Sequence, residues 1–172
     1  QYQRESAWTW EHQAIIRARP IAGSRRIASV FEELRSEVIH QPRELDDLQR
    51  QIIEMRARMS EQDPPSEDYF DLKSGRGGIT DIEFLVQYFV LKWAGQTPGL
   101  IRYTDNIRLL EGLAESGRLD QNTVSFMMDA YRAYRTRVHR LALQAEKPRV
   151  PPDEYMDFRC GIGRIWTEHL GS

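Results

Sequence analysis

The sequence predicts a mainly helical fold, arranged as a helical bundle, with a short strand near the N-terminus. Apolar residues recur every three or four positions along most of the chain, which is the spacing of one helix face. Short segments with proline, glycine or capping residues separate these apolar runs, as expected between helices. Hydrophobic residues make up 40% of the 172 residues and charged residues 29%, which is enough apolar material for a folded core.

The first 23 residues predict a short helix over residues 2–13, followed by a strand. In the stretch AIIRARPI, residues 14–21, apolar and basic residues alternate, which indicates a strand with Arg17 and Arg19 on one face. Pro20 would place this strand at a sheet edge. A lone strand needs a partner strand, so we expect this chain to be a piece of a longer protein. The polar N-terminus QYQRESAWTWEHQ has no signal-peptide pattern.

Residues 25–60 predict a helical hairpin. Ser24 can cap a helix over residues 25–39, and His40-Gln41-Pro42 separates it from a second helix over residues 43–60. The apolar stripes of the two helices are Ile27, Val30, Phe31, Leu34 and Val38 in the first, and Leu45, Leu48, Ile52, Met55 and Met59 in the second. A polar linker with two prolines follows over residues 61–70.

The rest of the chain predicts a glycine-rich loop and a bundle over residues 71–172. The first helix begins near Thr80 and ends before the segment 95–99. Further helices are expected over residues 105–115, with Gly117 as a left-handed cap, over 120–143, with Asp120 as N-cap, and over 155–170. The stripe of the long helix is Val124, Met127, Tyr131, Tyr134, Val138 and Leu141.

The segment DLKSGRGGITDIEF, residues 71–84, carries the strongest chemical signal. Glycines allow positive φ and close backbone approach, and the following helix N-terminus favours anions. The candidate nucleotide-binding residues in this loop are Lys73, Gly75, Arg76, Gly77 and Gly78, with Asp81 as a weak metal candidate. No Gly-Lys-Ser/Thr follows the glycines, so the loop is not a P-loop. Spacing alone favours a structural turn with a capped helix, and the phosphate role stays open.

Composition excludes several classes of function. The net charge of −2 gives no electrostatic basis for nucleic-acid binding. A single cysteine, Cys160, excludes an internal disulfide and a cysteine-based zinc site and suggests a reducing, cytoplasmic setting. Charged and polar residues interrupt the apolar run 79–94, so no membrane span is expected. Arg17 and Arg19 could form a solvated sheet edge or the edge of an anion site.

Three blocks of the sequence resemble one enzyme family. They are YQRESAWTWEHQAIIRARPIAG, DLKSGRGGITDIEFLVQY and RYTDNIRLLEGLAESGRL, in this order, and they resemble the C-terminal part of bacterial glutamine synthetase adenylyltransferases. The resemblance covers residues 1–145. The related PII uridylyltransferases have a similar glycine loop, but they lack the continuation that Ile82, Glu83, Phe84 and Gln87 supply here.

The resemblance implies a domain arrangement and an activity. The family has two polymerase-β-type nucleotidyltransferase domains, each followed by a helical domain; one half removes AMP from a tyrosine of glutamine synthetase and the other adds it from ATP. Residues 1–23 would be the edge of the second catalytic domain, and residues 24–172 its helical domain. The family's catalytic signature is a Gly-Ser turn followed by an Asp-x-Asp pair and a third carboxylate, and these carboxylates bind Mg²⁺ and position ATP. This combination does not occur in the sequence, so we expect this chain alone to be inactive.

The resemblance also implies roles and partners. The loop 73–81 could face the triphosphate of ATP or lock the helical domain against the catalytic one, and Arg17 and Arg19 would lie at the edge of the nucleotide cleft. The expected partners are glutamine synthetase, the PII signalling protein and the enzyme's own N-terminal catalytic domains. The arginine-bearing helix 120–143 is the candidate docking surface.

Overall fold

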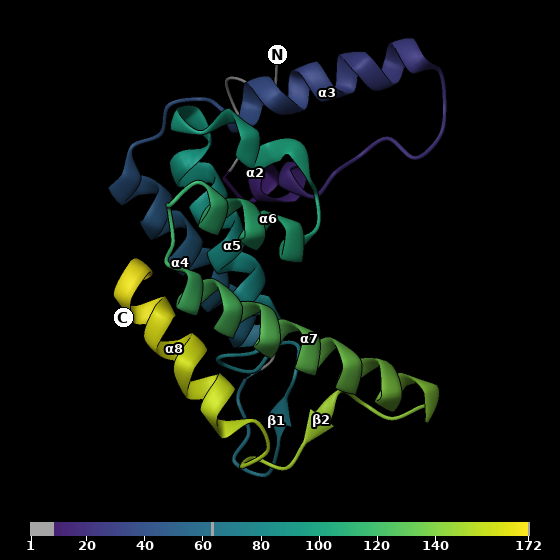
Figure 1. Ribbon diagram of the computed structural model, residues 1–172. Helices are drawn as coiled ribbons and strands as arrows, with labels where there is room; N and C mark the ends of the chain where they lie inside the picture. The colour runs from purple at the N-terminus through teal and green to yellow at the C-terminus, as the bar shows by residue number, and fades with distance from the viewer. Residues whose placement is uncertain (1–8, 63, 172) are drawn as a thin grey trace. The chain divides into compact units, whose positions relative to one another are not determined.

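A computed structural model describes residues 9–62 and 64–171, and it is mainly helical (Figure 1). This confirms the fold class predicted from the sequence. The chain forms two compact units, one made of Gln1–Ile52 and Val86–Leu119 and the other of Ile53–Leu85 and Asp120–Ser172. The division falls within helices α4 (Leu45–Gln62) and α5 (Ile79–Trp93), each of which contributes residues to both units.

The first unit contains α2 (Thr9–Ile16), α3 (Arg25–Ile39), the start of α4 and the end of α5. The 3-10 helices η1 (Ala94–Gln96) and η2 (Pro98–Arg102) and helix α6 (Asn106–Glu115) complete it. The Asp105 side chain accepts a hydrogen bond from the Arg108 amide at 3.0 Å and so caps α6. Gly117, with φ of 66°, adopts the predicted left-handed conformation after α6.

Two arginines hold the first unit together through backbone carbonyls. Arg35 is buried, and its guanidinium donates to the carbonyls of Ile15 at 3.2 Å, Ile16 at 2.7 Å and Ile101 at 3.0 Å. It thereby joins α3 to the end of α2 and to η2. Arg43 donates to carbonyls at the end of α3 and in the turn that follows, at Val38, Ile39 and Gln41. Burial lowers the pKa of Arg43 to about 10, so its guanidinium is still charged at neutral pH.

The predicted strand over residues 14–21 is wrong. Helix α2 continues through Ile16, and the amides of Arg17 and Ala18 donate to the carbonyls of Ala14 and Ile15, which closes the last helical turn. Ile16 is fully buried and its carbonyl accepts from Arg35, so tertiary contacts outweigh the alternating pattern. The predicted helix 2–13 is found only from Thr9 onward, because residues 1–8 lie outside the described part of the chain.

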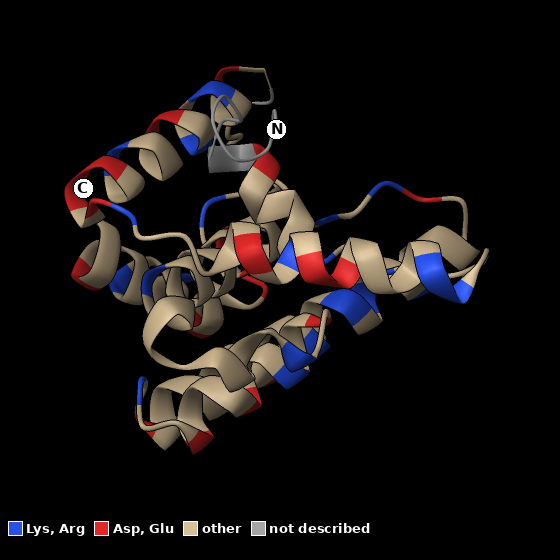
Figure 2. Cartoon of the chain, turned by 90° about the horizontal axis from the view of Figure 1, so that it is seen from above, with Lys and Arg blue, Asp and Glu red and all other residues tan. Residues whose placement is uncertain are grey.

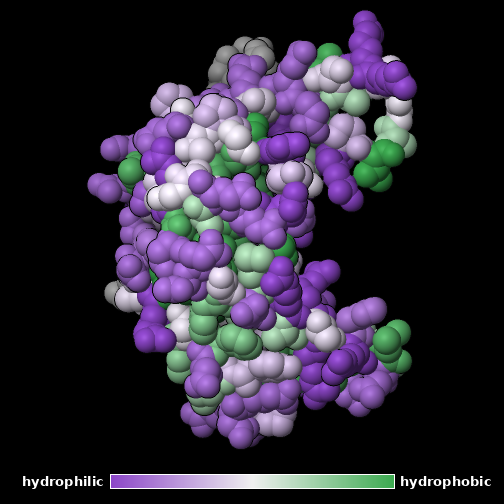
Figure 3. Space-filling model, viewed as in Figure 1, coloured by the Kyte–Doolittle hydropathy of each residue, from purple (hydrophilic) through white to green (hydrophobic). Residues whose placement is uncertain are grey.

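The helices predicted over 25–39 and 43–60 are confirmed, but their apolar stripes are only partly buried. Ile27 and Val30 in α3 are 66% and 58% exposed, whereas Val38 is fully buried. Figure 3 shows apolar patches among mostly hydrophilic residues on one face of the molecule. Ser24 occupies the N-cap position of α3, yet its side chain makes no capping hydrogen bond. The hairpin arrangement of these helices stays a prediction.

The second unit contains the rest of α4, strand β1 (Phe70–Asp71), the start of α5, α7 (Gln121–Leu143), strand β2 (Arg149–Val150) and α8 (Met156–Leu170). The two strands pair antiparallel, with Phe70 opposite Val150 and Asp71 opposite Arg149. No pattern in the sequence predicts these strands, because each has only two residues. Asp120 accepts from the Thr123 amide at 2.9 Å, which confirms the predicted cap of α7.

Aromatic residues form the core of the second unit beside the strands. The ring of Tyr134 meets those of Phe70, Tyr155 and Phe158 edge-on, with centroids 5.4–6.1 Å apart. Most of the predicted stripe of α7 is buried, including Val124, Met127, Tyr131, Tyr134 and Leu141. The strands and α8 are therefore anchored to α7 by a shared aromatic cluster.

The small net charge of −2 agrees with the distribution of charged residues in the structure. Basic and acidic residues lie interspersed along the helices (Figure 2). Within the described residues, no helix combines the length and the apolar character that crossing a lipid bilayer requires.

Two glycines of α8 give a stability prediction. A Cβ at Gly161 would come within 2.2 Å of the Phe126 ring, whereas a Cβ at Gly163 would meet no atom within 4 Å. We expect Gly161→Ala to destabilise the protein by about 1–3 kcal/mol through overpacking. Gly163→Ala should stabilise it by about 0.5–1 kcal/mol, because alanine favours helix. Urea unfolding of both variants measures these changes. Equal changes in the free energy of unfolding would mean that the Phe126 ring moves aside at no cost.

Candidate functional site

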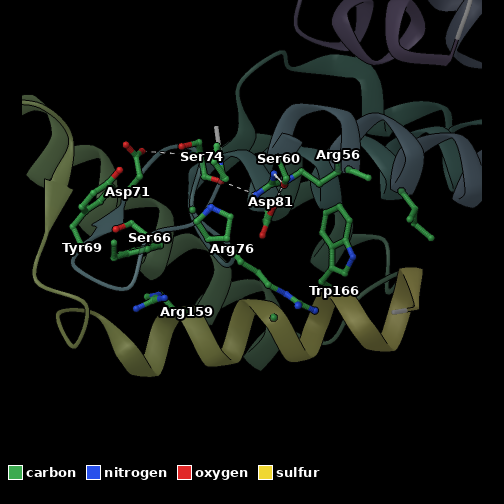
Figure 4. Close-up of a pocket in the computed structure, with 17 residues that line it drawn as sticks. Arg56, Ser60, Ser66, Tyr69, Asp71, Ser74, Arg76, Asp81, Arg159 and Trp166 are labelled. Atoms are coloured by element: carbon green, nitrogen blue, oxygen red, sulfur yellow. Dashed lines mark hydrogen bonds and ion pairs between the residues drawn. The ribbon is translucent and has the colours of Figure 1, made fainter. Parts of the chain in front are cut away.

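A cavity of about 420 Å³ lies beside the glycine-rich loop, entirely within the second unit (Figure 4). Helix α4 provides one wall, and the segment 64–66 with β1 provides another. The glycine-rich loop and α8 complete the cavity. Its lining residues include Arg56, Ser60, Tyr69, Asp71, Arg76, Asp81, Arg159 and Trp166. The cavity has the size of a small-molecule site.

The backbone of the glycine-rich loop is folded onto itself. The Asp71 carboxylate accepts from the amides of Lys73 at 2.9 Å and Ser74 at 3.1 Å, and the Asp71 carbonyl accepts from the Gly75 amide at 2.9 Å. The Gly78 amide donates to the Gly75 carbonyl, also at 2.9 Å. An aspartate at the start of a turn is suited to this pattern, because its side chain bonds the backbone two and three residues on.

The loop is also bonded to the start of α5. The amides of Ile79 and Thr80 donate to the carbonyls of Leu72 and Lys73 at 2.9 and 3.0 Å. A phosphate-binding loop presents free amides at a helix N-terminus, but here these amides already have partners within the chain. The loop therefore offers an anion its side chains rather than a cradle of backbone amides.

The three glycines of the loop are required by close packing. A Cβ at Gly75 would lie 2.5 Å from the Asp71 carbonyl oxygen and 2.7 Å from the Phe70 ring. A Cβ at Gly77, where φ is 81°, would lie 2.5 Å from the Arg159 carbonyl oxygen. A Cβ at Gly78 would lie 2.8 Å from the Gly75 carbonyl oxygen. Gly77 thus lets the loop lie directly against the backbone of α8.

A buried ion pair connects the loop to α4 and α5. The Arg56 Nε donates to Asp81 Oδ1 at 2.5 Å, and the other oxygen of Asp81 accepts from the Gly77 amide at 2.6 Å. The Arg56 guanidinium also donates to the Ser74 carbonyl at 2.7 Å and the Ser60 hydroxyl at 2.5 Å. Both side chains are at least 90% buried. Asp81 therefore holds the loop in place, and neither of its oxygens is free for a metal ion.

Two further guanidinium groups line the cavity. The Arg159 guanidinium lies 4.1 Å from the Phe70 ring centroid and donates to the Pro152 carbonyl. Arg76 is exposed and has no ion pair or hydrogen bond with the described residues. Figure 4 shows Arg159 and Trp166 on α8, across the cavity from Arg56 and Asp81.

The structure brings together only some of the residues that the sequence singled out. Gly75 and Arg76 line the cavity together with Asp81, whereas Lys73 is exposed in the same loop and does not line it. Arg17 and Arg19 belong to the first unit and are exposed. The strand spacing that placed them on one face does not exist, because Arg17 follows the end of α2 and Arg19 lies in an irregular segment.

Sequence reasoning missed Arg56, Arg159 and Trp166 as cavity residues. Arg56 stands in helix α4 next to the stripe position Met55, and a buried arginine gives no sign in an amphipathic pattern. Arg159 and Trp166 are seven residues apart in α8, which puts them on one helix face; this spacing was the available signal. Among the described residues, no group of three or more histidine, cysteine or acidic side chains is placed to hold a metal ion.

Two family models match the chain. One, described as glutamate-ammonia ligase adenylyltransferase, matches residues 1–34, and the other, described as GlnD PII-uridylyltransferase, matches residues 46–150. The second match covers a related helical domain.

Curated relatives match over nearly the whole chain. The bifunctional glutamine synthetase adenylyltransferase/adenylyl-removing enzyme of Pseudomonas aeruginosa is 46% identical over 97% of this chain and 18% of its own length. The enzymes of the same name from Nitrosococcus oceani and Pasteurella multocida are 45% and 42% identical, over 98% and 96% of this chain and 18% and 17% of their own. This chain thus spans less than a fifth of these relatives' length. It belongs to the glutamine synthetase adenylyltransferase/adenylyl-removing enzyme family.

Proposed function

We propose that this chain is the helical domain of the adenylylating half of an enzyme that transfers AMP from ATP to a tyrosine of glutamine synthetase in the bacterial cytoplasm. The main support for this proposal is the 46% identity, over 97% of the chain, to a bifunctional glutamine synthetase adenylyltransferase/adenylyl-removing enzyme. In this proposal residues 1–23 are the edge of the preceding catalytic domain. The adenylyltransferase family model matches residues 1–34, which supports that placement.

The Mg²⁺ that such transfer needs does not fit the described residues. Both oxygens of Asp81 have partners, and residues 9–62 and 64–171 contain no group of three or more histidine, cysteine or acidic side chains placed to hold a metal ion. In this proposal Mg²⁺ is held by the catalytic domain of the longer enzyme. Metal-held charge neutralisation is central to phosphoryl and nucleotidyl transfer, so the chain alone is expected to be inactive.

Within the longer enzyme, Lys73 and Arg76 are proposed to contact the nucleotide phosphates. Both side chains are exposed in one loop, and they are its two cationic groups. The loop backbone that carries them is held by Arg56, Asp81 and α8. Arg17 and Arg19 are proposed to lie at the edge of the same nucleotide cleft.

A second candidate function is docking of glutamine synthetase or the PII signalling protein on α7. Arg132, Arg135 and Arg140 are exposed along this helix. Asp129 lies 3.7 Å from Arg132, so the surface is only partly basic.

The test is transfer of labelled AMP from ATP to purified glutamine synthetase. We expect the longer enzyme to label it and this chain alone to give no label. Lys73→Ala with Arg76→Ala should lower the rate about a hundredfold, the effect of two lost charge-assisted contacts of about 1.5 kcal/mol each. An unchanged rate would remove the phosphate role.

The same assay separates the alternatives. Arg132→Ala with Arg140→Ala should leave the rate unchanged unless α7 docks glutamine synthetase, in which case the KM for glutamine synthetase should rise. Transfer of label from UTP to the PII protein, with none from ATP to glutamine synthetase, would instead identify a PII uridylyltransferase.

A further inference from the structure

The cavity of the second unit contains cationic groups without matching carboxylates. Of its lining residues, Arg56 is neutralised by Asp81 at 2.5 Å. The second lining carboxylate, Asp71, faces Arg149 at 3.7 Å and also accepts two loop amides. The charges of Arg76 and Arg159 therefore remain uncompensated at one cavity.

Both of these guanidinium groups have donors to offer. Arg76 has no partner among the described residues, and its side chain is exposed at the cavity. Arg159 is half-buried and uses one terminal nitrogen for the Pro152 carbonyl, while its other terminal nitrogen has no hydrogen-bond partner among the described residues. Guanidinium groups bind carboxylate and phosphate through paired donors in a fixed geometry. The cavity thus favours an anion.

The other walls of the cavity are apolar and aromatic. Trp166 is half-buried and packs against Phe84, with ring centroids 6.5 Å apart, so its indole is held in place. Opposite α8, Ile53 and Ala57 of α4 and the prolines 64 and 65 add apolar surface. A ligand with an anionic group alone would leave these walls in contact with water, whereas a planar or apolar body would cover them.

We propose that this cavity is a binding site for a small organic anion, with Arg76 holding its phosphate or carboxylate group, Arg159 adding positive charge to the same cavity and Trp166 lying against the ligand's planar or apolar body (Figure 4). The volume of about 420 Å³ is in the range of small-molecule sites, which bury most of their ligand. The site is a property of the helical domain itself and does not depend on AMP transfer by the longer enzyme.

The test is binding to the purified 172-residue chain, followed by NMR through the indole N–H of Trp166. The probes are AMP, benzoate, inorganic phosphate and adenosine. AMP or benzoate should shift the Trp166 signal at millimolar concentration. Inorganic phosphate lacks the planar body and adenosine lacks the anionic group, so each should bind about tenfold more weakly or not at all. AMP alone would identify a phosphate site, and benzoate alone a carboxylate site.

Two arginine variants make the test specific. Arg76→Gln should weaken binding about tenfold, whereas Arg58→Gln should leave it unchanged, because Arg58 is exposed on α4 in the same unit but does not line the cavity. Both side chains are exposed, so the melting temperatures of the variants should match the parent's. No shift of Trp166 with either AMP or benzoate would overturn the proposal. Equal weakening by the two variants would also overturn it, since that would show general attraction to basic side chains.

Discussion

Gly77→Ala is expected to destabilise the second unit by about 3 kcal/mol or more, from backbone strain and overpacking together. The backbone of Gly77 has φ of 81°, a conformation that alanine adopts at a cost. The added Cβ would also lie 2.5 Å from the carbonyl oxygen and 2.8 Å from the Cα of Arg159. These are backbone atoms of α8, so relief requires the loop and the helix to separate.

Gly117→Ala is the matched control. Gly117 also has positive φ, 66°, but a Cβ there would meet no atom within 4 Å. It should cost about 1–2 kcal/mol, the strain of a left-handed residue alone. Urea unfolding of the two variants measures the difference, which is the contribution of close packing between the loop and α8. Equal losses in the two variants would show that the loop moves away from α8 at no cost.

The helices were predictable because their signals are local. Gly117 ends one helix and Asp120 begins another through bonds or dihedral angles within a few residues, and the structure has both as predicted. The segment 14–21 failed for the opposite reason. Its alternating pattern predicted a strand, but Ile16 is buried and its carbonyl binds Arg35, nineteen residues away. A hydrogen bond to a residue so distant in the chain leaves no signal in the sequence pattern of the segment itself.

The candidate site shows the same limit. The glycines and charges of residues 73–78 could be read from the sequence, but not what they contact. Position 77 has no room for a side chain because the backbone of Arg159 in α8 lies against it. The charge of Asp81 is neutralised by Arg56 in α4. These partners come from parts of the chain that only the fold brings together. The loop was therefore recognised, while the cavity beside it was not.

Asp81→Asn is expected to destabilise the second unit by about 3–5 kcal/mol, because it leaves the buried Arg56 without its counter-charge. The Asp81 side chain is 5% exposed and that of Arg56 10%. The matched control is Asp129→Asn on α7, whose carboxylate lies 3.7 Å from Arg132 with both side chains more than half exposed. That change should cost less than about 1 kcal/mol, since water screens exposed pairs. Urea unfolding measures both.

A double variant separates the charge interaction from packing. Arg56→Met with Asp81→Leu removes both charges and keeps apolar volume, so it should lose less stability than Asp81→Asn alone. The remaining loss then reports the hydrogen bonds to the Gly77 amide, the Ser74 carbonyl and the Ser60 hydroxyl. If the double variant is instead as unstable as the sum of its single changes, the two side chains act independently and the ion pair does not hold the loop.

A loop that depends on this pair should also lose the position of Arg76, so ligand binding at the cavity should weaken in Asp81→Asn even where the protein remains folded.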